Sequence, residues 1–187
     1  MSNYFQNFNA ITYKQQVALN IAQRVVIPKD LRDSPFVYLP YTIQEGDTPE
    51  LVSYYYYDSV DLVWLVYFAN GVIDPATDWL MDTNIFHKYL IKKYEGPSNK
   101  KGTKVLDWLK NETIAQNIVF YRRVDDPHIK ITHQSYLLDP TIQAEDWECV
   151  RLYQYEFEAN EAKRTIRLVN KEYADQFQTA LGKALNE

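Results

Sequence analysis

The chain has 187 residues, a formal net charge of −5 and a hydrophobic fraction of 46%. That hydrophobic fraction supports a buried core and excludes a disordered protein, and the length allows one large domain or a small domain with structured extensions. The negative charge, with no basic run longer than two residues, disfavours binding to the phosphate backbone of a nucleic acid.

Three sequence features bear on the cell compartment. Cys149 is the one cysteine, so no intrachain disulfide can form, and we expect a buried structural thiol in a reducing compartment. The longest apolar run, residues 62–69, is too short to span a bilayer. The first residues lack the basic start and apolar stretch of a signal peptide. We therefore expect a soluble protein made in the cytoplasm.

Tyrosine is abundant, with 16 residues in an aromatic fraction of 15%. A tyrosine ring can be buried while its hydroxyl stays in water, so surplus tyrosines often mark protein interfaces. The alternative is a tyrosine-rich core with hydroxyls at its edge. The composition alone leaves both interpretations open.

Residues 1–36 are polar and irregular, with scattered apolar side chains. Residues 17–22 could form a short helix or strand, and residues 24–28 look extended up to Pro28. We expect an extended N-terminal arm that is either wrapped on the body of the protein or laid on a partner.

The next segment predicts a strand, a turn and a helix. Tyr41 and Ile43 alternate with polar residues, which is the pattern of a half-buried strand. Gly46 can take the left-handed conformation in the turn that follows. Thr48 suits the N-cap of a helix ending at Tyr57, and the proline after Thr48 suits its first position.

A second helix is predicted over residues 60–69 and is capped by Asp58 or Ser59. Its residues 62–68 are all apolar or aromatic, so they cover every face of the helix. Gly71 is the expected left-handed residue at its end. One face must enter the core, and something else must cover the rest.

The second half of the chain mixes helix and strand patterns. Residues 83–93 have helical spacing, and residues 96–102 form the clearest loop and the best boundary. Residues 164–169 alternate like a strand, and residues 173–185 predict an amphipathic helix. Three further stretches have the composition of strands: residues 117–124, 129–138 and 148–157.

The residues needed for catalysis are not grouped. His128 and His133 are an odd number of residues apart in a predicted strand region, which places them on opposite faces, and His87 is isolated on a helix. The acidic pairs 125–126 and 145–146 are typical of solvated loops. No phosphate-binding loop or hydrolase motif occurs. We predict no enzyme activity, no catalytic residue, no metal site and no cofactor.

The strand, turn and helix resemble the start of a LysM module, a small βααβ unit that usually binds sugar polymers. By this analogy a groove for peptidoglycan or a chitin-like sugar would lie between residues 46–49 and the loop after Asn70. Sugar-binding modules close soon after that position with a strand, which residues 71–79 do not provide, and they tend to be repeated. The matching residues, with a structural role, are Tyr41, Ile43, Gly46, Asp47, Thr48 and Asn70.

Longer stretches resemble the LysM-like baseplate wedge protein of contractile-tailed bacteriophages of the T-even type. The resemblance implies a non-enzymatic virion protein of the tail baseplate, assembled in the host cytoplasm. It further implies that the protein joins the wedge and helps neighbouring wedges close into a ring around the hub. Residues 97–145 match nothing in that family. The similar stretches are residues 36–41 and 46–50, residues 61–70 with 74–75 and Trp79, residues 153–158, and residues 160–168 with Tyr173 and Phe177.

We therefore predict an α+β fold: a LysM-like βαα core with an extended N-terminal arm and a C-terminal strand–helix unit. The predicted parts are the arm at 1–36, the LysM-like domain and following helix at 37–95, a loop and β-rich insertion at 96–152, and the strand and helix at 153–187. We expect the tail after Asn160 to be an interaction element that the core can lose without unfolding. The expected partners are other wedge proteins, and the candidate partner-binding residues are Trp64, Tyr67, Phe68, Trp79, Arg164, Ile166, Leu168, Tyr173 and Phe177.

Overall fold

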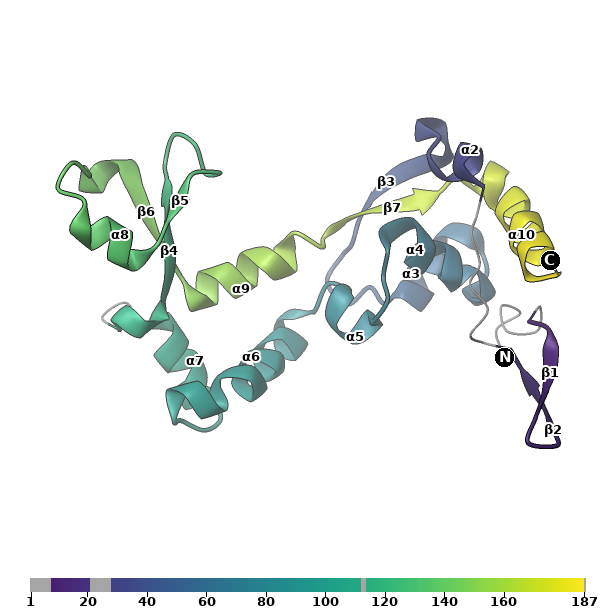
Figure 1. Cartoon of the computed structure of the whole chain (residues 1–187), viewed down its shortest axis with the longest axis horizontal. Helices are drawn as coiled ribbons and strands as arrows, with labels where there is room; N and C mark the ends of the chain where they lie inside the picture. The colour runs from purple at the N-terminus through teal and green to yellow at the C-terminus, as the bar shows by residue number, and fades with distance from the viewer. Residues whose placement is uncertain (1–7, 21–27, 112–113, 187) are drawn as a thin grey trace. The chain divides into compact units, whose positions relative to one another are not determined.

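The computed structural model describes residues 8–20, 28–111 and 114–186, and the fold is α+β (Figure 1). The chain divides into two compact units: unit 1 is Met1–Trp79 with Arg164–Glu187, and unit 2 is Leu80–Lys163. In sequence, unit 2 is therefore an insertion within unit 1. The boundaries predicted after residues 95 and 152 both fall inside unit 2, and the one after residue 36 falls inside unit 1.

The sheet of unit 1 has two antiparallel strands, β3 (Tyr38–Thr42) and β7 (Thr165–Val169). In the register Tyr41 lies opposite Ile166, and the amide of Ile43 extends the ladder by donating to the carbonyl of Arg164 at 2.9 Å. The strand that follows the insertion thus completes the sheet begun before it. The prediction of a separate C-terminal strand is corrected, because local pattern does not reveal the partner of a strand.

Two helices follow β3, and their ends are set by local contacts. In α3 (Pro49–Tyr57) the hydroxyl of Thr48 accepts from the amide of Leu51 at 3.3 Å, as predicted for an N-cap. The helix α4 (Val63–Asn70) starts three residues later than predicted, after a 3₁₀ turn at Val60–Leu62. It ends at Gly71, which has φ 64°, as expected. A short helix, α5 (Pro75–Asp78), follows.

The C-terminal helix α10 (Lys171–Asn186) belongs to the core of unit 1. The ring of Phe177 packs edge-on against the ring of Phe68 with centroids 5.8 Å apart. Removal of the chain after Asn160 would take away both β7 and this helix, so the expectation of a separable tail is wrong. The buried residues of the helix keep the predicted helical spacing: Ala174, Phe177, Leu181 and Leu185.

The N-terminal segment contains a hairpin of β1 (Ala10–Tyr13) and β2 (Gln16–Leu19), whose strand residues are all exposed. At its base the side-chain amide of Asn9 donates to the carbonyl of Leu185 at 2.6 Å. A short helix α2 (Lys29–Arg32) and a 3₁₀ turn (Pro35–Val37) lead to β3. The described part of the predicted arm is thus a hairpin followed by a short helix and a turn. Residues 1–7 and 21–27, including most of the extended stretch before Pro28, lie outside the described residues.

Unit 2 combines helices with a three-stranded sheet in the order β5-β4-β6. One hydrophobic cluster centres on Phe86, Leu90, Val105 and Leu109. The elements are α6 (Thr83–Ser98), α7 (Thr103–Lys110), β4 (Ile118–Arg123), β5 (Lys130–Ile131), α8 (His133–Leu138), β6 (Trp147–Arg151) and α9 (Leu152–Glu161).

Three local predictions in unit 2 are corrected. The predicted loop at 96–102 is shorter, because α6 continues through Pro97 and ends before Asn99, which has φ 51°. The strand predicted at 129–138 is confirmed only as the two residues of β5, and α8 follows, capped by the hydroxyl of Thr132. The strand predicted at 148–157 ends at Arg151, since a six-residue aromatic alternation fits a half-buried helix as well as a strand.

If β7 is part of the core, Leu168→Ala destabilises unit 1. Leu168 is fully buried, so the truncation should cost about 3 kcal/mol through lost contacts and a residual cavity. Urea unfolding, with hydrogen exchange of the β3 amides as a local readout, measures the loss. Leu39 lies opposite on β3 and is exposed, so Leu39→Ala is the control and should cost less than about 1 kcal/mol. Equal small losses would contradict the buried position of β7.

Candidate functional site

The turn between β3 and α3 is organised by the carboxylate of Asp47. This group accepts from the hydroxyl of Tyr41 at 3.0 Å and from the amide of Gln44 at 2.9 Å. Burial, and then the hydrogen bond to Asp47, raises the pKa of the Tyr41 hydroxyl. Gly46 has φ 88°, which side-chain-bearing residues rarely adopt. Two LysM-motif residues, Tyr41 and Asp47, are thus hydrogen-bonded to each other, while Gly46 shapes the turn and Thr48 caps α3.

Trp79 closes the space beside this turn. Its indole N–H donates to the carbonyl of Asp47 at 2.8 Å, and only 6% of the residue is exposed. This contact ties the loop at 46–49 to the segment that follows Asn70. The prediction that Trp79 binds a partner is corrected, because the side chain is buried within unit 1.

Asn70 joins the end of α4 to β7. Its side-chain N–H group donates to the carbonyls of Val66 and Arg167, both at 2.8 Å, and its side-chain oxygen accepts from the amide of Arg167 at 2.8 Å. A side chain that pairs both ways with one backbone residue acts like an added sheet partner. These hydrogen bonds give Asn70 a structural role, as predicted.

Four of the nine predicted partner-binding residues are buried inside unit 1, Trp79 among them. Ile166, Leu168 and Phe177 are buried, which corrects their prediction as surface contacts. These apolar side chains are part of the core of unit 1, because β7 and α10 are core elements.

The remaining candidates are half-buried. The hydroxyl of Tyr67 donates to the carboxylate of Glu50 at 3.1 Å, and burial, with that charge as a second cause, raises its pKa to about 12. Arg164 donates to the carbonyl of Ile43 at 3.1 Å. Intramolecular packing therefore covers much of the aromatic helix that was expected to be exposed. The half-buried set is Trp64, Tyr67, Phe68, Arg164 and Tyr173.

Several exposed apolar groups of unit 1 lie on α3 and on the hairpin, and none of them is among the predicted partner-binding residues. Leu51, Tyr54 and Tyr55 project from α3, whose opposite side is buried. Ile11 and Val17 are exposed on the hairpin. Helical spacing could have indicated the exposed residues of α3, because a helix that buries Val52 and Tyr57 turns Leu51, Tyr54 and Tyr55 away from the core.

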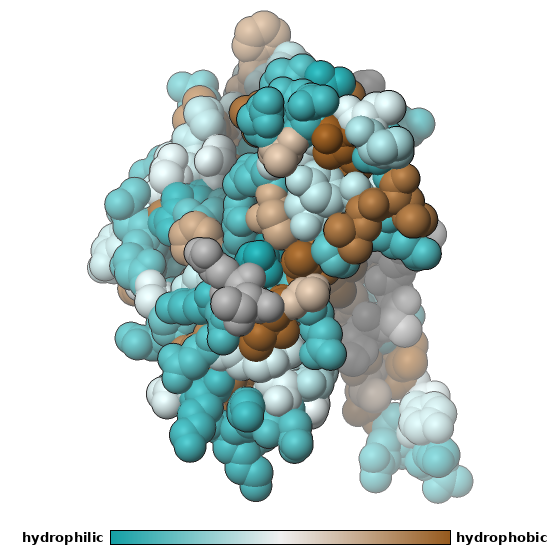
Figure 2. Space-filling model, turned by 90° about the vertical axis from the view of Figure 1, so that its left-hand side faces the viewer, coloured by the Kyte–Doolittle hydropathy of each residue, from teal (hydrophilic) through white to brown (hydrophobic). Residues whose placement is uncertain are grey.

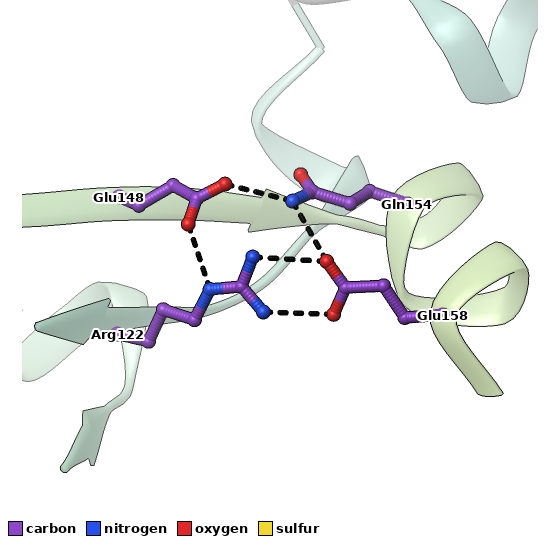
Figure 3. Close-up of polar contacts among 4 residues, drawn as sticks. All are labelled: Arg122, Glu148, Gln154 and Glu158. Atoms are coloured by element: carbon purple, nitrogen blue, oxygen red, sulfur yellow. Dashed lines mark hydrogen bonds and ion pairs between the residues drawn. The ribbon is translucent and has the colours of Figure 1, made fainter. Parts of the chain in front are cut away.

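Unit 2 contains a charged network that links β4, β6 and α9 (Figure 3). The Nε of Arg122 donates to Glu148 at 2.7 Å, and its two terminal nitrogens donate to both oxygens of Glu158 at 2.8 and 2.9 Å. Gln154 donates to both carboxylates, at 2.8 and 3.0 Å. The hydrogen bonds from Arg122 are the main reason that the pKa values of both glutamates are lowered. No local sequence pattern indicates this network, because its members lie on three separate elements.

On the end of unit 2 that carries β5, β6 and α8, hydrophobic patches stand among hydrophilic side chains (Figure 2). Exposed apolar residues of this part of the chain include Val124, Ile129, Leu137 and Leu138. Nearby, Tyr121 stacks on Tyr136 with centroids 3.8 Å apart. Ring stacking and the hydrogen bond that caps α8 therefore hold this region together.

The described residues offer little chemistry beyond packing and ion pairs. Among them, no group of three or more His, Cys, Asp or Glu side chains is placed to hold a metal ion. Nδ1 of His133 lies 3.3 Å from the hydroxyl of Tyr121, and Nε2 of His87 lies 3.3 Å from that of Tyr153. A cavity of about 540 Å³ opens between Pro28 and α10, and its lining holds one carboxylate and one ammonium group.

Comparison with known proteins adds no family assignment. No protein-family model matches the chain, and a search of curated proteins finds no significant match. Within the described ranges, every helix falls short of the length and apolar character needed to cross a membrane.

Gly46→Ala should destabilise unit 1 by about 1 kcal/mol, because alanine at φ 88° is strained. An added Cβ would meet no atom within 4 Å, so the cost is one of backbone conformation alone. Gly182→Ala, inside α10 of the same unit, is the control and should be neutral or stabilising. Thermal unfolding measures both; an unchanged Gly46→Ala protein would refute the left-handed turn.

Arg122→Gln should destabilise unit 2 by about 1 kcal/mol near pH 7, a modest value because the ion pairs are partly exposed. The glutamate pKa values are lowered in the folded state, so their contribution is present above the ordinary value of 4.5 and is lost as the pH falls below it. The difference from wild type should therefore shrink on acidification in urea unfolding. Arg123→Gln, which breaks an exposed pair with Asp125, is the control and should have little effect.

Proposed function

We propose that the chain is a structural protein of a phage tail baseplate wedge, where it holds neighbouring wedge subunits together during assembly. The observation that carries the proposal is the exposure of apolar and aromatic side chains on two elements of unit 1, α3 and the β1–β2 hairpin. Exposed apolar groups of this kind are typical of surfaces that become buried in an assembly. On this proposal the protein is non-enzymatic and resides in the virion.

The arrangement of unit 1 supports a LysM-like origin. The elements β3, α3, α4 and β7 follow the order of a βααβ unit, with unit 2 inserted before the closing strand. The motif residues hold this arrangement together through Asp47 and Asn70. The insertion accounts for the lack of a closing strand directly after the second helix.

A sugar-binding role receives less support. By analogy with LysM modules, the sugar would lie between the loop at 46–49 and the segment after Asn70. Trp79 is buried beside this loop and donates to the carbonyl of Asp47. A protein-holding role needs no open groove at this position, so the geometry favours it.

Co-sedimentation of the full-length protein with the wedge proteins of its phage tests the proposal. We expect a stable complex, and we expect that particles made without the protein lack a sheathed tail. Failure to co-sediment, together with normal sheathed tails in its absence, would refute the proposal. Calorimetry with N-acetylglucosamine oligomers is the parallel experiment: we expect no binding, and millimolar or tighter affinity would support the sugar-binding role.

A further inference from the structure

The outer side of α3 carries a row of exposed, largely apolar side chains. Leu51, Tyr54 and Tyr55 are 39%, 55% and 65% exposed, and their spacing of three and four residues puts them on one stripe of the helix. Within the described residues, the hydroxyls of Tyr54 and Tyr55 make no hydrogen bond. We call these three residues the α3 face.

Four consecutive tyrosines occupy positions 54–57, and the last two, Tyr56 and Tyr57, have partners inside unit 1. The hydroxyl of Tyr57 donates to the carbonyl of Val169 at 2.8 Å, and Tyr56 packs edge-on against Tyr57 and beneath the ammonium group of Lys171. Core packing therefore explains Tyr56 and Tyr57, whereas Tyr54 and Tyr55 stay exposed and contact each other's rings, with centroids 6.0 Å apart.

The segment around this face is acidic, and one cation stands beside it, because Lys171 pairs with Asp58. No lysine or arginine occurs between Arg32 and Lys88. Glu50 and Asp58 lie four residues before and after Tyr54, so both carboxylates flank the stripe. Within unit 1 this part of the chain carries eight acidic residues: Asp33, Glu45, Asp47, Glu50, Asp58, Asp61, Asp74 and Asp78.

The basic residues of β7 and the start of α10 have partners within unit 1, and one of these partners is Asp58 beside the face. Lys171 pairs with Asp58 at 3.0 Å, Arg164 donates to the carbonyl of Ile43, and Arg167 donates to the carbonyl of Ala69 while its guanidinium lies over the ring of Tyr38. The carboxylate of Glu50 accepts from the hydroxyl of Tyr67 at 3.1 Å, and among the described residues it has no ion pair with a lysine or arginine.

We propose that the α3 face docks a protein surface that presents arginine side chains. A guanidinium can lie over a tyrosine ring and pair with a carboxylate at the same time, and Leu51 supplies apolar contact beside it. Charge complementarity favours such a partner over an acidic or a neutral one. The inference rests on the proposed role as a structural subunit and names the chemistry of one partner surface.

A defined probe tests the α3 face in the full-length protein. The probe is a capped peptide of alternating glycine and arginine, and the matched control peptide has glutamate in place of arginine. In amide NMR spectra we expect the arginine peptide alone to shift the resonances of residues 50–58. The shifts should weaken as NaCl is raised from about 0.05 M to about 0.5 M. Equal effects of the two peptides, or shifts confined to other elements, would overturn the proposal.

Variants separate this face from other exposed tyrosines. The double variant Tyr54→Ser with Tyr55→Ser should weaken peptide binding about tenfold, whereas Tyr13→Ser should leave it unchanged. Tyr13 is 61% exposed on the hairpin and stands beside Lys14 instead of a carboxylate. Glu50→Gln retains an acceptor for Tyr67 and should weaken binding about threefold, which keeps the test decisive if the double variant misfolds. Unchanged binding in Glu50→Gln or in the folded double variant overturns the proposal.

Co-sedimentation with the wedge proteins tells the two proposals apart. If the wild-type protein and the double variant co-sediment equally, the docking face is wrong and the proposed function stands. If the wild-type protein fails to co-sediment while the arginine peptide still binds the α3 face, the docking face stands and its partner is not a wedge protein.

Discussion

The pairing of β3 with β7 joins two stretches of chain that unit 2 separates in sequence, and the core of unit 1 depends on it. Closing so long a loop costs conformational entropy, although the cost grows slowly with loop length. Unit 2 lowers this cost by folding around its own cluster. Near its two ends, the side chain of Asn160 donates to and accepts from the backbone of Met81, at 2.9 and 3.0 Å. The ends of the insertion are thereby held close together.

The residues that resemble a LysM motif serve this closure. The side chain of Asp47 fixes the turn before α3, and its backbone carbonyl accepts a hydrogen bond from the indole N–H of Trp79. The side chain of Asn70 connects the end of α4 to β7. Their hydrogen bonds are directed inward, toward the backbone of the same unit. The motif accordingly explains how unit 1 folds, and the exposed large apolar side chains of the unit belong to other residues.

Polar side chains give unit 2 its internal connections. The buried carboxylate of Glu156 accepts from the ammonium of Lys93 and from the hydroxyl of Tyr94, at 2.7 and 2.6 Å, and so joins α9 to α6. Arg122 joins β4 of the sheet to α9 through its hydrogen bonds to Glu158. A buried carboxylate needs such partners, since an unpaired charge in the interior is costly. Unit 2 is thus specified by charge pairing as well as by its apolar cluster.

The sequence by itself determined the features that depend on neighbours a few residues away. The cap at Thr48, the left-handed Gly46 and Gly71, and the buried spacing of α10 follow from local geometry and were predicted correctly. Only the tertiary structure decided that β7 pairs with β3, that the aromatic run at 153–157 is helical, and that Trp79, Leu168 and Phe177 are buried while Tyr54 and Tyr55 are exposed. Burial depends on contacts between distant segments, and a residue's type and local spacing do not specify those contacts.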